Sequence, residues 1–366
     1  MSVPDISARP MSRARRSAGP ASAKNDLPDP RPSMRVKLVM RRPLPGQFSV
    51  ERVFRDVAGA LPADIDASLV EVPYRSQGIL PRLGNMLFTA RLRADVVHIT
   101  GDIQYCALAV RSSRCVLTVL DLVSVRRLSG WRKRILSMIW YRLPVRHAAA
   151  ITTISTTIRD ELLDGFPTAA HKTSVIGCPV SDHFQPAPAS GLGSNEFRVL
   201  QVGTGPNKNL ERVATAIVGL PVHLHVVGRI TDEQRHVMER LGLSYSEDAD
   251  LSDSDMRCAY QTSNLLIFAS TYEGFGLPIV EAQACGLPVV TSAIPPMCDI
   301  AGDAAVLVDP HDAASIRSGV VAVLRDASLR SGLSQFGPLN AARHSPTRVA
   351  AEYADTYRRV VTRKLL

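Results

Sequence analysis

The chain of 366 residues is long enough for two or three domains, each with its own core. Its composition, 45% hydrophobic and 21% charged, is that of an ordinary globular protein. No run approaches the roughly 20 consecutive apolar residues that a membrane-spanning helix requires. The net charge of +9 is compatible with three kinds of partner: nucleic acid, an acidic membrane surface or an anionic substrate.

Residues 1–33 are rich in Pro, Ser, Ala and Arg and lack the apolar stretch of a secretory signal. We therefore expect a disordered N-terminal tail.

The six cysteines form no C-x-x-C pair, and none is paired with a histidine at metal-ligand spacing. Free thiols in a reducing, cytoplasmic location are the simplest interpretation.

After the tail, short apolar runs alternate with helical segments. We expect strands at 34–40, 94–99, 115–120 and 148–154, and helices at 51–60 and 157–163. Strands that alternate with helices predict βαβ units and a parallel sheet. We assign residues 34–180 to an N-terminal Rossmann-like domain.

A segment rich in Pro, Ser and Gly at 179–194 is the predicted linker, and a second alternation follows it. The expected strands are 197–202, 222–227, 264–269, 287–292 and 305–308, and the expected helices include 209–218, 231–241 and 253–262. We assign 181–345 to a second Rossmann-like domain, and 346–366 to a C-terminal helix that packs toward the first. The predicted fold class is α/β, with two Rossmann-like domains that face a cleft.

The most informative segment is E-G-F-G-L-P-I-V-E, which runs from Glu273 to Glu281. It follows an apolar strand and places Pro278 at the start of a helix, where proline loses no needed N–H. A helix N-terminus preceded by glycines favours a bound phosphate. Carboxylates cannot hold the phosphate, so the two glutamates must accept from other groups, and sugar hydroxyls fit. The segment therefore predicts a nucleotide-sugar site.

Together with the following A-Q-A-C-G-L-P-V-V, this segment resembles the donor-site signature of retaining GT-B glycosyltransferases of the family-4 type. The resemblance is strong from about residue 197 onward and weaker before it. It implies transfer of a sugar from a nucleotide-diphosphate sugar to an acceptor hydroxyl, with retention and without a metal or other cofactor. It also implies cell-surface polysaccharide or lipopolysaccharide biosynthesis, and a saccharide or lipid-linked acceptor.

A second loop, G-T-G-P-N-K-N at 203–209, also lies between a strand and a helix and brings a lysine to the helix start. It is not a Walker A loop, because the G-x4-G spacing is missing. In the family this loop commonly reads G-R-x-x-x-x-K-N, so Lys208 and Asn209 match while Thr204 replaces the arginine. Arg229 and Arg257 are weak candidates for the missing charge.

The resemblance assigns catalytic roles to Glu273 and Lys208. Glu273 is expected to orient the transferred sugar, Lys208 to contact the diphosphate and Glu281 to accept from the ribose. The full set of predicted donor-binding residues is Gly203, Thr204, Lys208, Asn209, Glu273, Gly274, Phe275, Gly276, Leu277 and Glu281.

The acceptor side is harder to predict. The single glycine Gly46 stands where the family has a glycine loop after the first strand. Asp121 lacks the histidine that often precedes it in the family, and His98, at the end of an earlier strand, is a candidate to face the cleft. All three also have an ordinary structural interpretation.

The segment 131–142, W-R-K-R-I-L-S-M-I-W-Y-R, is basic with apolar residues at helical spacing. Such a helix can lie on the cytoplasmic face of an anionic membrane, and it can equally pack into a core with its cations in water.

Two Asp-x-Asp pairs, at 248–250 and 253–255, challenge the metal-free prediction, because such pairs can hold a metal ion. We interpret them as loop and helix-start residues, with Ser252 or Asp253 as N-cap.

Two alternatives remain open at this stage. One is a GT-B sugar-nucleotide epimerase, and the other is a non-catalytic basic protein that binds membrane or nucleic acid. No helix-turn-helix, RNA-recognition or zinc-finger pattern supports nucleic acid.

Overall fold

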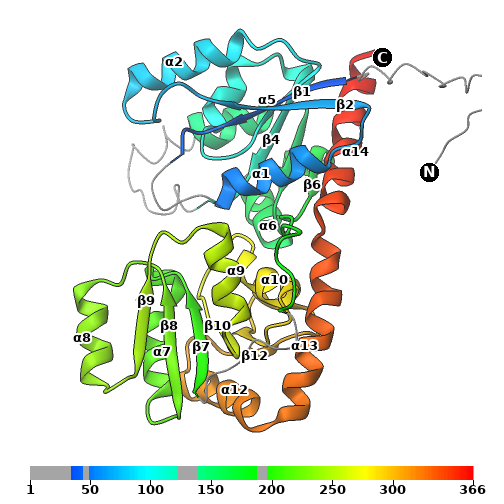
Figure 1. Ribbon diagram of the computed structural model, residues 1–366. Coiled ribbons are helices and arrows are strands. Elements are labelled where there is room, and N and C mark those ends of the chain that lie inside the picture. The colour runs from blue at the N-terminus through cyan, green and yellow to red at the C-terminus, as the bar shows by residue number, and fades with distance from the viewer. Residues whose placement is uncertain (1–33, 44–48, 123–137, 188–195, 366) are drawn as a thin grey trace, which may run out of the picture. The chain divides into compact units, whose positions relative to one another are not determined.

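The computed structural model describes residues 34–43, 49–122, 138–187 and 196–365. In this part of the chain the strands form two six-stranded sheets, and every strand pairing is parallel (Figure 1). All-parallel sheets need helices on their faces, which explains the continuous apolar runs of their central strands.

The first sheet has the order β2-β1-β3-β4-β5-β6. Its strands are β1 (Met34–Met40), β2 (Ile65–Glu71), β3 (Val96–Ile99), β4 (Cys115–Val119), β5 (Ala150–Thr153) and β6 (Thr173–Val175). Strands β3 and β4 are buried along their whole length, whereas the edge strands β2 and β6 are mostly half-buried. Apolar side chains such as Leu38 and Leu117 make the centre of the core.

Helices and short turns connect these strands. They are α1 (Ser49–Ala60), α2 (Ile79–Ala90), η1 (Gln104–Ala109), η2 (Ser112–Arg114), η3 (Met138–Arg142), α5 (Leu143–His147), α6 (Thr156–Gly165) and η4 (Pro167–Lys172). Ser155 caps α6, because its hydroxyl accepts from the backbone N–H of Ile158 at 3.3 Å.

The second sheet has the order β12-β11-β10-β7-β8-β9. Its strands are β7 (Phe197–Val202), β8 (Val222–Val227), β9 (Tyr245–Asp248), β10 (Leu265–Phe268), β11 (Val289–Ser292) and β12 (Val306–Val308). The chain winds outward from β7 to β9, and then starts again on the other side of β7 with β10. The point where the order reverses therefore lies between β7 and β10, and this is where open α/β sheets bind ligands.

The connections in this half are η5 (Pro206–Lys208), α7 (Leu210–Ile217), α8 (Asp232–Arg240), α9 (Asp253–Gln261), α10 (Leu277–Ala284), α11 (Met297–Ala301), α12 (Ala313–Arg325), α13 (Ala327–Ala341) and η6 (Ala342–His344). Capping boxes begin α8 at Thr231 and α9 at Ser252. The second cap confirms one of the two N-caps expected for the aspartate-rich segment.

The last helix, α14 (Pro346–Leu365), returns to the first sheet. Tyr353 packs edge-on against Phe54 of α1, and Tyr357 bonds to His98 of β3 at 2.8 Å. Arg358 pairs with Asp64 at 3.0 Å. The contacts of α14 with α1 and β3 agree with the direction expected for the C-terminal helix.

Most predicted elements are present with boundaries shifted by a few residues. The sequence analysis did not identify β2, β6 and β9 among the strands, or α2, α5, α11, α12 and α13 among the helices. Residues 1–33, which include the predicted tail, lie outside the described residues.

Candidate functional site

Two loops meet at the reversal point of the second sheet. One follows β7 and carries the G-T-G-P-N-K-N segment; the other follows β10 and carries the E-G-F-G-L-P segment. The amide of Asn209 joins them, because it donates to the carbonyls of Ala269 at 2.9 Å and Pro310 at 2.7 Å. Asn209 itself adopts φ 62°, a left-handed conformation that asparagine tolerates better than most residues. The predicted match at this position therefore has a structural reason.

Lys208 and Glu273 form the centre of the site. The Lys208 ammonium donates to the Glu273 carboxylate at 2.7 Å, and Asn207 donates to the same oxygen at 3.2 Å. The ammonium also lies 4.5 Å from the centre of the Phe268 ring. Gly203, at φ 90°, leaves room for the lysine, since a Cβ there would come within 2.9 Å of the Lys208 Cε atom. Both catalytic candidates are therefore held together, with mutually neutralising charges.

The second loop ends at the start of α10. Gly276 adopts φ 108°, and the helix begins at Leu277 with Pro278 second rather than first. The first N–H groups of this helix lie at the same edge of the sheet as Lys208. Gly274 approaches the backbone so closely that a Cβ would lie 2.7 Å from the Leu120 oxygen. The Phe275 side chain is buried and packs edge-on against His344, so only its backbone is available to a ligand.

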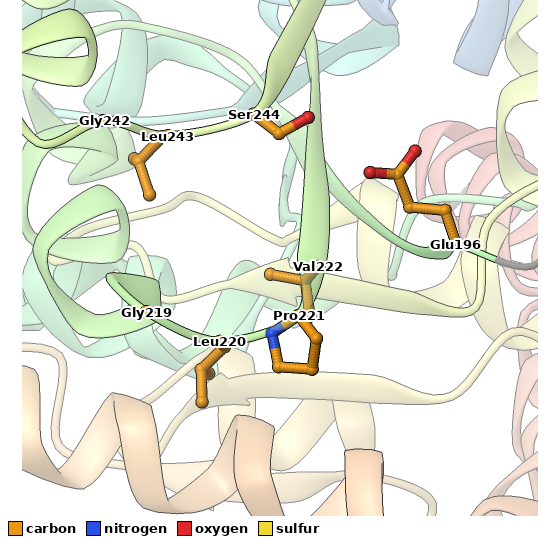
Figure 2. A pocket seen from close by; sticks show the side chains of 8 residues that line it. All are labelled: Glu196, Gly219, Leu220, Pro221, Val222, Gly242, Leu243 and Ser244. Carbon is orange, nitrogen blue, oxygen red and sulfur yellow. The ribbon is translucent and has the colours of Figure 1, made fainter.

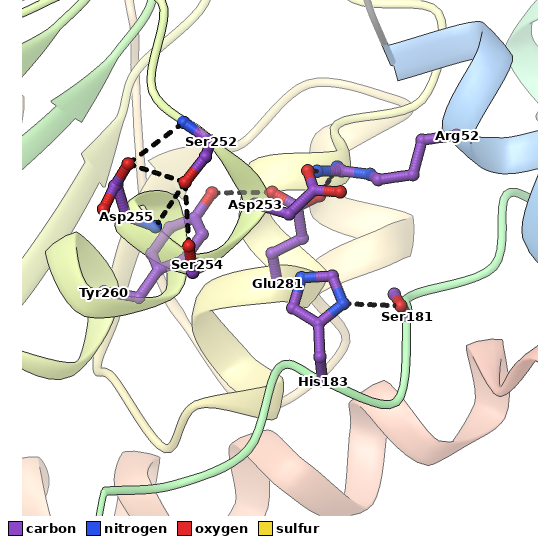
Figure 3. Close-up of polar contacts among 9 residues, drawn as sticks. All are labelled: Arg52, Ser181, His183, Ser252, Asp253, Ser254, Asp255, Tyr260 and Glu281. Carbon is purple, nitrogen blue, oxygen red and sulfur yellow. Dashed lines mark hydrogen bonds and ion pairs between the residues drawn. The ribbon is translucent and has the colours of Figure 1, made fainter.

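Glu281 lies deeper than the sequence analysis assumed. Glu281 is only 4% exposed, and one of its carboxylate oxygens accepts a hydrogen bond from the Tyr260 hydroxyl at 2.8 Å. Figure 3 shows Arg52 reaching from α1 to the other Glu281 oxygen, and Arg52 also donates to Asp253 at 3.0 Å. The predicted contact of Glu281 with ribose stays a prediction, and any ribose must share this carboxylate with Arg52 and Tyr260.

The charges in this network shift the pKa values of its members. Burial, followed by the neighbouring Glu281, raises the pKa of Tyr260 well above its usual value. Burial alone would lower the pKa of Arg52, but Glu281 and then Asp253 raise it overall. Arg52 therefore stays charged and is an anchored cation beside the donor loops. No local pattern in the sequence identified it, because its partners lie more than 200 residues away.

Thr204, which replaces the arginine common in the family, has hydrogen-bond partners of its own. Its hydroxyl donates to the backbone carbonyl of Arg229 at 2.6 Å, and its own carbonyl accepts from Gln234 at 2.8 Å. The Arg229 side chain is exposed and pairs with Asp250 at 2.5 Å. Arg257 is also exposed, so the structure holds neither candidate cation over the Lys208 loop.

The Asp-x-Asp pairs have other partners. Asp248 lies 3.4 Å from His225, and Asp250 and Asp253 pair with arginines. Asp255 completes the capping box of Ser252. In the described ranges, no group of three or more His, Cys, Asp or Glu side chains is arranged to hold a metal ion.

The acceptor-side predictions fare less well. His98 does not face a cleft: its side chain is fully buried, with one ring nitrogen 2.8 Å from the Tyr357 hydroxyl and the other 2.6 Å from the Thr118 hydroxyl. That prediction is wrong, because α14 covers this strand. Asp121 is half-buried after β4, and its carbonyl accepts from Tyr141 at 3.1 Å. Gly46 lies outside the described residues.

The structure adds an ion cluster at the reversal point of the first sheet, between β1 and β3. Arg41, directly after β1, pairs with Glu51 at 3.0 Å and with Asp102, which follows β3. Glu51 is buried, and its second oxygen has no hydrogen-bond partner among the described atoms. A buried carboxylate oxygen of this kind can accept a hydroxyl group, so the cluster is the better candidate for an acceptor contact.

Burial of His98 also predicts a pH effect on stability. Desolvation lowers its pKa to about 3, while an unfolded histidine titrates near 6.5. The unfolded state therefore takes up the proton first as pH falls below 6.5, and the native state loses stability from there down to about pH 3. Between pH 7.5 and 5 this amounts to roughly 2 kcal/mol. Urea unfolding measures the free energy of unfolding at pH 7.5 and at pH 5. We expect the loss of this free energy between the two pH values to be smaller in His98→Gln by roughly 2 kcal/mol. The control His236→Gln, which changes an exposed histidine, should lose as much as the wild type.

A separate depression of about 590 Å³ lies at the opposite edge of the second sheet (Figure 2). Its lining includes Pro221 and Val222, where β8 begins, and Ser244, just before β9. This is the amino edge of the strands, away from both donor loops. Phosphate sites in such sheets lie at the carboxyl edge, so we assign the depression no part in the donor site.

Two family models match most of the chain. Residues 30–179 match the glycosyl transferase 4-like domain, and residues 187–339 match the glycosyl transferases of group 1. The chain belongs to the GT-B glycosyltransferase family of the family-4-like type. The predicted family and fold class are therefore confirmed.

Solved structures agree with the glycosyltransferase fold. Sucrose-phosphate synthase from Thermosynechococcus elongatus superposes with a TM-score of 0.73 at 16% identity, over 90% of this chain and 99% of that one. Anabaena HepE, in complex with UDP-glucose, gives 0.72 at 16% identity, over 89% and 100%. WaaG, a glycosyltransferase involved in lipopolysaccharide biosynthesis, gives 0.66 at 16%, over 87% and 98%. At these identities the likeness concerns the fold.

Among curated relatives, the Escherichia coli O-antigen chain mannosyltransferase B is 40% identical over 78 residues, which are 21% of this chain and 20% of that protein. The MMP alpha-(1->4)-mannosyltransferase of Mycolicibacterium hassiacum is 26% identical over 208 residues, 52% of this chain and 50% of that protein. The chain thus spans between a fifth and a half of the length of these relatives. In the described residues, no helix has the length and apolar character needed to cross a membrane.

Proposed function

We propose that the protein transfers a hexose from a nucleotide-diphosphate sugar to an acceptor hydroxyl, with retention at the anomeric carbon and without a metal. The observation that supports this most directly is the convergence of Lys208, Glu273 and the N-terminus of α10 at the reversal point of the second sheet. A cation and the positive end of a helix suit a diphosphate, and an adjacent carboxylate suits sugar hydroxyls.

In this proposal the diphosphate takes over the Lys208 ammonium from Glu273. The ammonium and the positive N-terminal end of α10 then stabilise the charge that grows on the leaving diphosphate. Glu273, released from the lysine, accepts from hydroxyls of the transferred sugar and fixes its orientation. Glu281 accepts from the ribose. The buried cluster around Glu51 contacts the acceptor in the first half of the chain.

The names of the relatives support a narrower version. Several are mannosyltransferases, and two act on O-antigen chains by name. We therefore propose mannose as the transferred sugar and a cell-surface polysaccharide or lipopolysaccharide precursor as the acceptor. A cytoplasmic location at the inner membrane face fits a lipid-linked acceptor of this kind.

A donor panel tests the proposal. GDP-mannose, UDP-glucose and related sugars are each incubated with the protein, and nucleoside diphosphate release and sugar transfer are measured with EDTA or with Mg²⁺. The proposal expects release from one class of donor at equal rates in both conditions, and a product with the anomeric configuration of the donor. Epimerised sugar nucleotide would indicate the epimerase instead. An inactive protein that binds no donor would refute an enzymatic function, and activity lost in EDTA and restored by metal would refute the metal-free mechanism.

The Glu281 assignment predicts a separate effect on the free nucleotide. Glu281→Gln removes a charged acceptor, and such hydrogen bonds contribute about 1.5–3 kcal/mol, so we expect nucleoside diphosphate affinity to fall by roughly tenfold or more. Asp253→Asn is the matched control, because it removes the other carboxylate that Arg52 contacts. Calorimetric titration should show near wild-type affinity for the control; equal affinities in all three proteins would contradict the ribose contact.

A further inference from the structure

Helix α2 has its polar and apolar faces reversed relative to an ordinary surface helix. Its fully buried side chains are Asn85 and Thr89. Its outward face carries Ile79, Leu80, Leu83 and Leu87, which are 74%, 80%, 49% and 60% exposed. Water-facing helices normally bury the apolar stripe and expose the polar one. The exposed face of α2 is therefore built for an apolar surrounding.

The buried polar face is fixed in place, so the apolar face cannot turn inward. The Asn85 amide donates to the Tyr74 carbonyl and to the Tyr105 hydroxyl, both at 2.9 Å, and its oxygen accepts from the Tyr74 N–H at 3.0 Å. The Thr89 hydroxyl donates to the Asn85 carbonyl at 2.8 Å. A helix satisfied in this way would leave several buried polar groups unpaired if it rotated.

The apolar surface extends beyond α2. The Arg82 guanidinium stacks on the Trp140 ring at 4.5 Å, which ties α2 to η3. Met138 of η3 and Leu143 at the start of α5 are also exposed, at 45% and 38%. Seven of the exposed large apolar side chains therefore lie in this part of the first half: Tyr74, Ile79, Leu80, Leu83, Leu87, Met138 and Leu143. We call them the α2 surface, after the helix labelled α2 in Figure 1.

The charged residues of the segment that carries α2 all have the same sign. Residues 72–94 contain four arginines and no Asp or Glu. Arg75 before the helix and Arg91 and Arg93 after it are exposed, as is Arg142 beside Leu143. A second copy of this chain would bring arginine against arginine, which opposes self-association. An apolar face ringed by cations instead matches a lipid bilayer with anionic headgroups.

We propose that the α2 surface docks the protein on an anionic lipid bilayer. This deepens the proposed function, on which it rests, because a docked α2 would hold the first half of the chain against a lipid-linked acceptor. It also differs from the surface expected at 131–142. Residues 131–137 lie outside the described residues, and only Met138 and Arg142 of that segment contribute exposed side chains here.

The test is sedimentation with vesicles in the absence of any donor or acceptor. The vesicles are phosphatidylcholine alone, or phosphatidylcholine mixed with phosphatidylglycerol, at rising salt. We expect the full chain to bind only the mixed vesicles and to dissociate as salt rises. Leu80→Gln/Leu87→Gln should weaken binding by at least about tenfold. Arg91→Gln/Arg93→Gln should weaken it by roughly 25-fold, since each surface cation contributes about a factor of five.

Phe336→Gln/Leu339→Gln is the matched control, because these α13 side chains are 60% and 68% exposed but lie outside the α2 surface. It should bind vesicles like the wild type. Leu80→Gln/Leu87→Gln should keep wild-type nucleotide affinity, so a failed donor site is distinguished from a failed docking surface. The proposal would be overturned if the wild-type protein did not sediment with the anionic vesicles. The proposal would also be overturned if light scattering showed a wild-type dimer that Leu80→Gln/Leu87→Gln converts to monomers, since the α2 surface would then join two copies of the chain.

Discussion

Glu273→Gln is expected to reduce turnover by at least about 100-fold while the variant still binds free nucleoside diphosphate. Glu273 is the carboxylate nearest Lys208 and accepts from Asn207 as well. In the proposed mechanism it orients the sugar, so its loss acts on the reacting geometry rather than on the nucleotide. A neutral amide also removes a negative charge beside the diphosphate. The affinity for the free nucleotide should therefore stay the same or rise.

The measurement combines steady-state transfer with calorimetric titration of the nucleoside diphosphate. Glu211→Gln is the control, because it makes the same change on an exposed carboxylate in the first turn of α7, just after the Lys208 loop. It should leave both quantities near the wild-type values. Turnover of Glu273→Gln within threefold of the wild type would contradict a role in orienting the sugar.

The donor loops were predictable because their signals are local. Glycines, a lysine and a helix-starting proline follow apolar strands within a few residues of one another. The parallel sheet then brings the ends of β7 and β10 together, which the strand–helix alternation implies. The sequence alone did not show that Lys208 and Glu273 neutralise each other, since a side chain's partner depends on loop geometry.

The missed strands share a physical cause. β2, β6 and β9 are edge strands, and their residues are mostly half-buried or exposed. A strand with one neighbour needs no continuous apolar run, and β9 reads Y-S-E-D. Helix α2 was missed because its sequence holds Pro81 and Gly84, two residues that normally interrupt a helix.

The acceptor-side residues were poorly predicted for a different reason: the residues that contact one another there are distant in sequence. Arg41 and Asp102 are 61 residues apart, and neither belongs to a recognisable pattern. His98 was chosen because it ends a strand, but its partner Tyr357 comes 259 residues later. Only the return of α14 decides that this histidine is enclosed.

Lys208→Ala is expected to weaken binding of a nucleoside diphosphate by one to two orders of magnitude. A charge-assisted hydrogen bond to phosphate contributes about 1.5–3 kcal/mol. Thr204 supplies no charge, and Arg229 is held by Asp250, so the charge of the loop after β7 comes from Lys208. Titration calorimetry measures the loss, and Lys208→Arg should restore part of the affinity by keeping the charge.

The ion pair with Glu273 makes this prediction sharper. In Lys208→Ala the Glu273 carboxylate loses its cation and stays partly buried beside the incoming phosphate. Its repulsion adds to the loss of the ammonium, so the single variant should be the weakest binder. Lys208→Ala/Glu273→Gln removes both charges, and we expect it to bind nucleoside diphosphate more tightly than Lys208→Ala alone. Such non-additivity is the signature of two neighbouring groups that act on one ligand. If the double variant binds no better than Lys208→Ala, Glu273 does not lie beside the phosphate, and the two loops do not form one donor site.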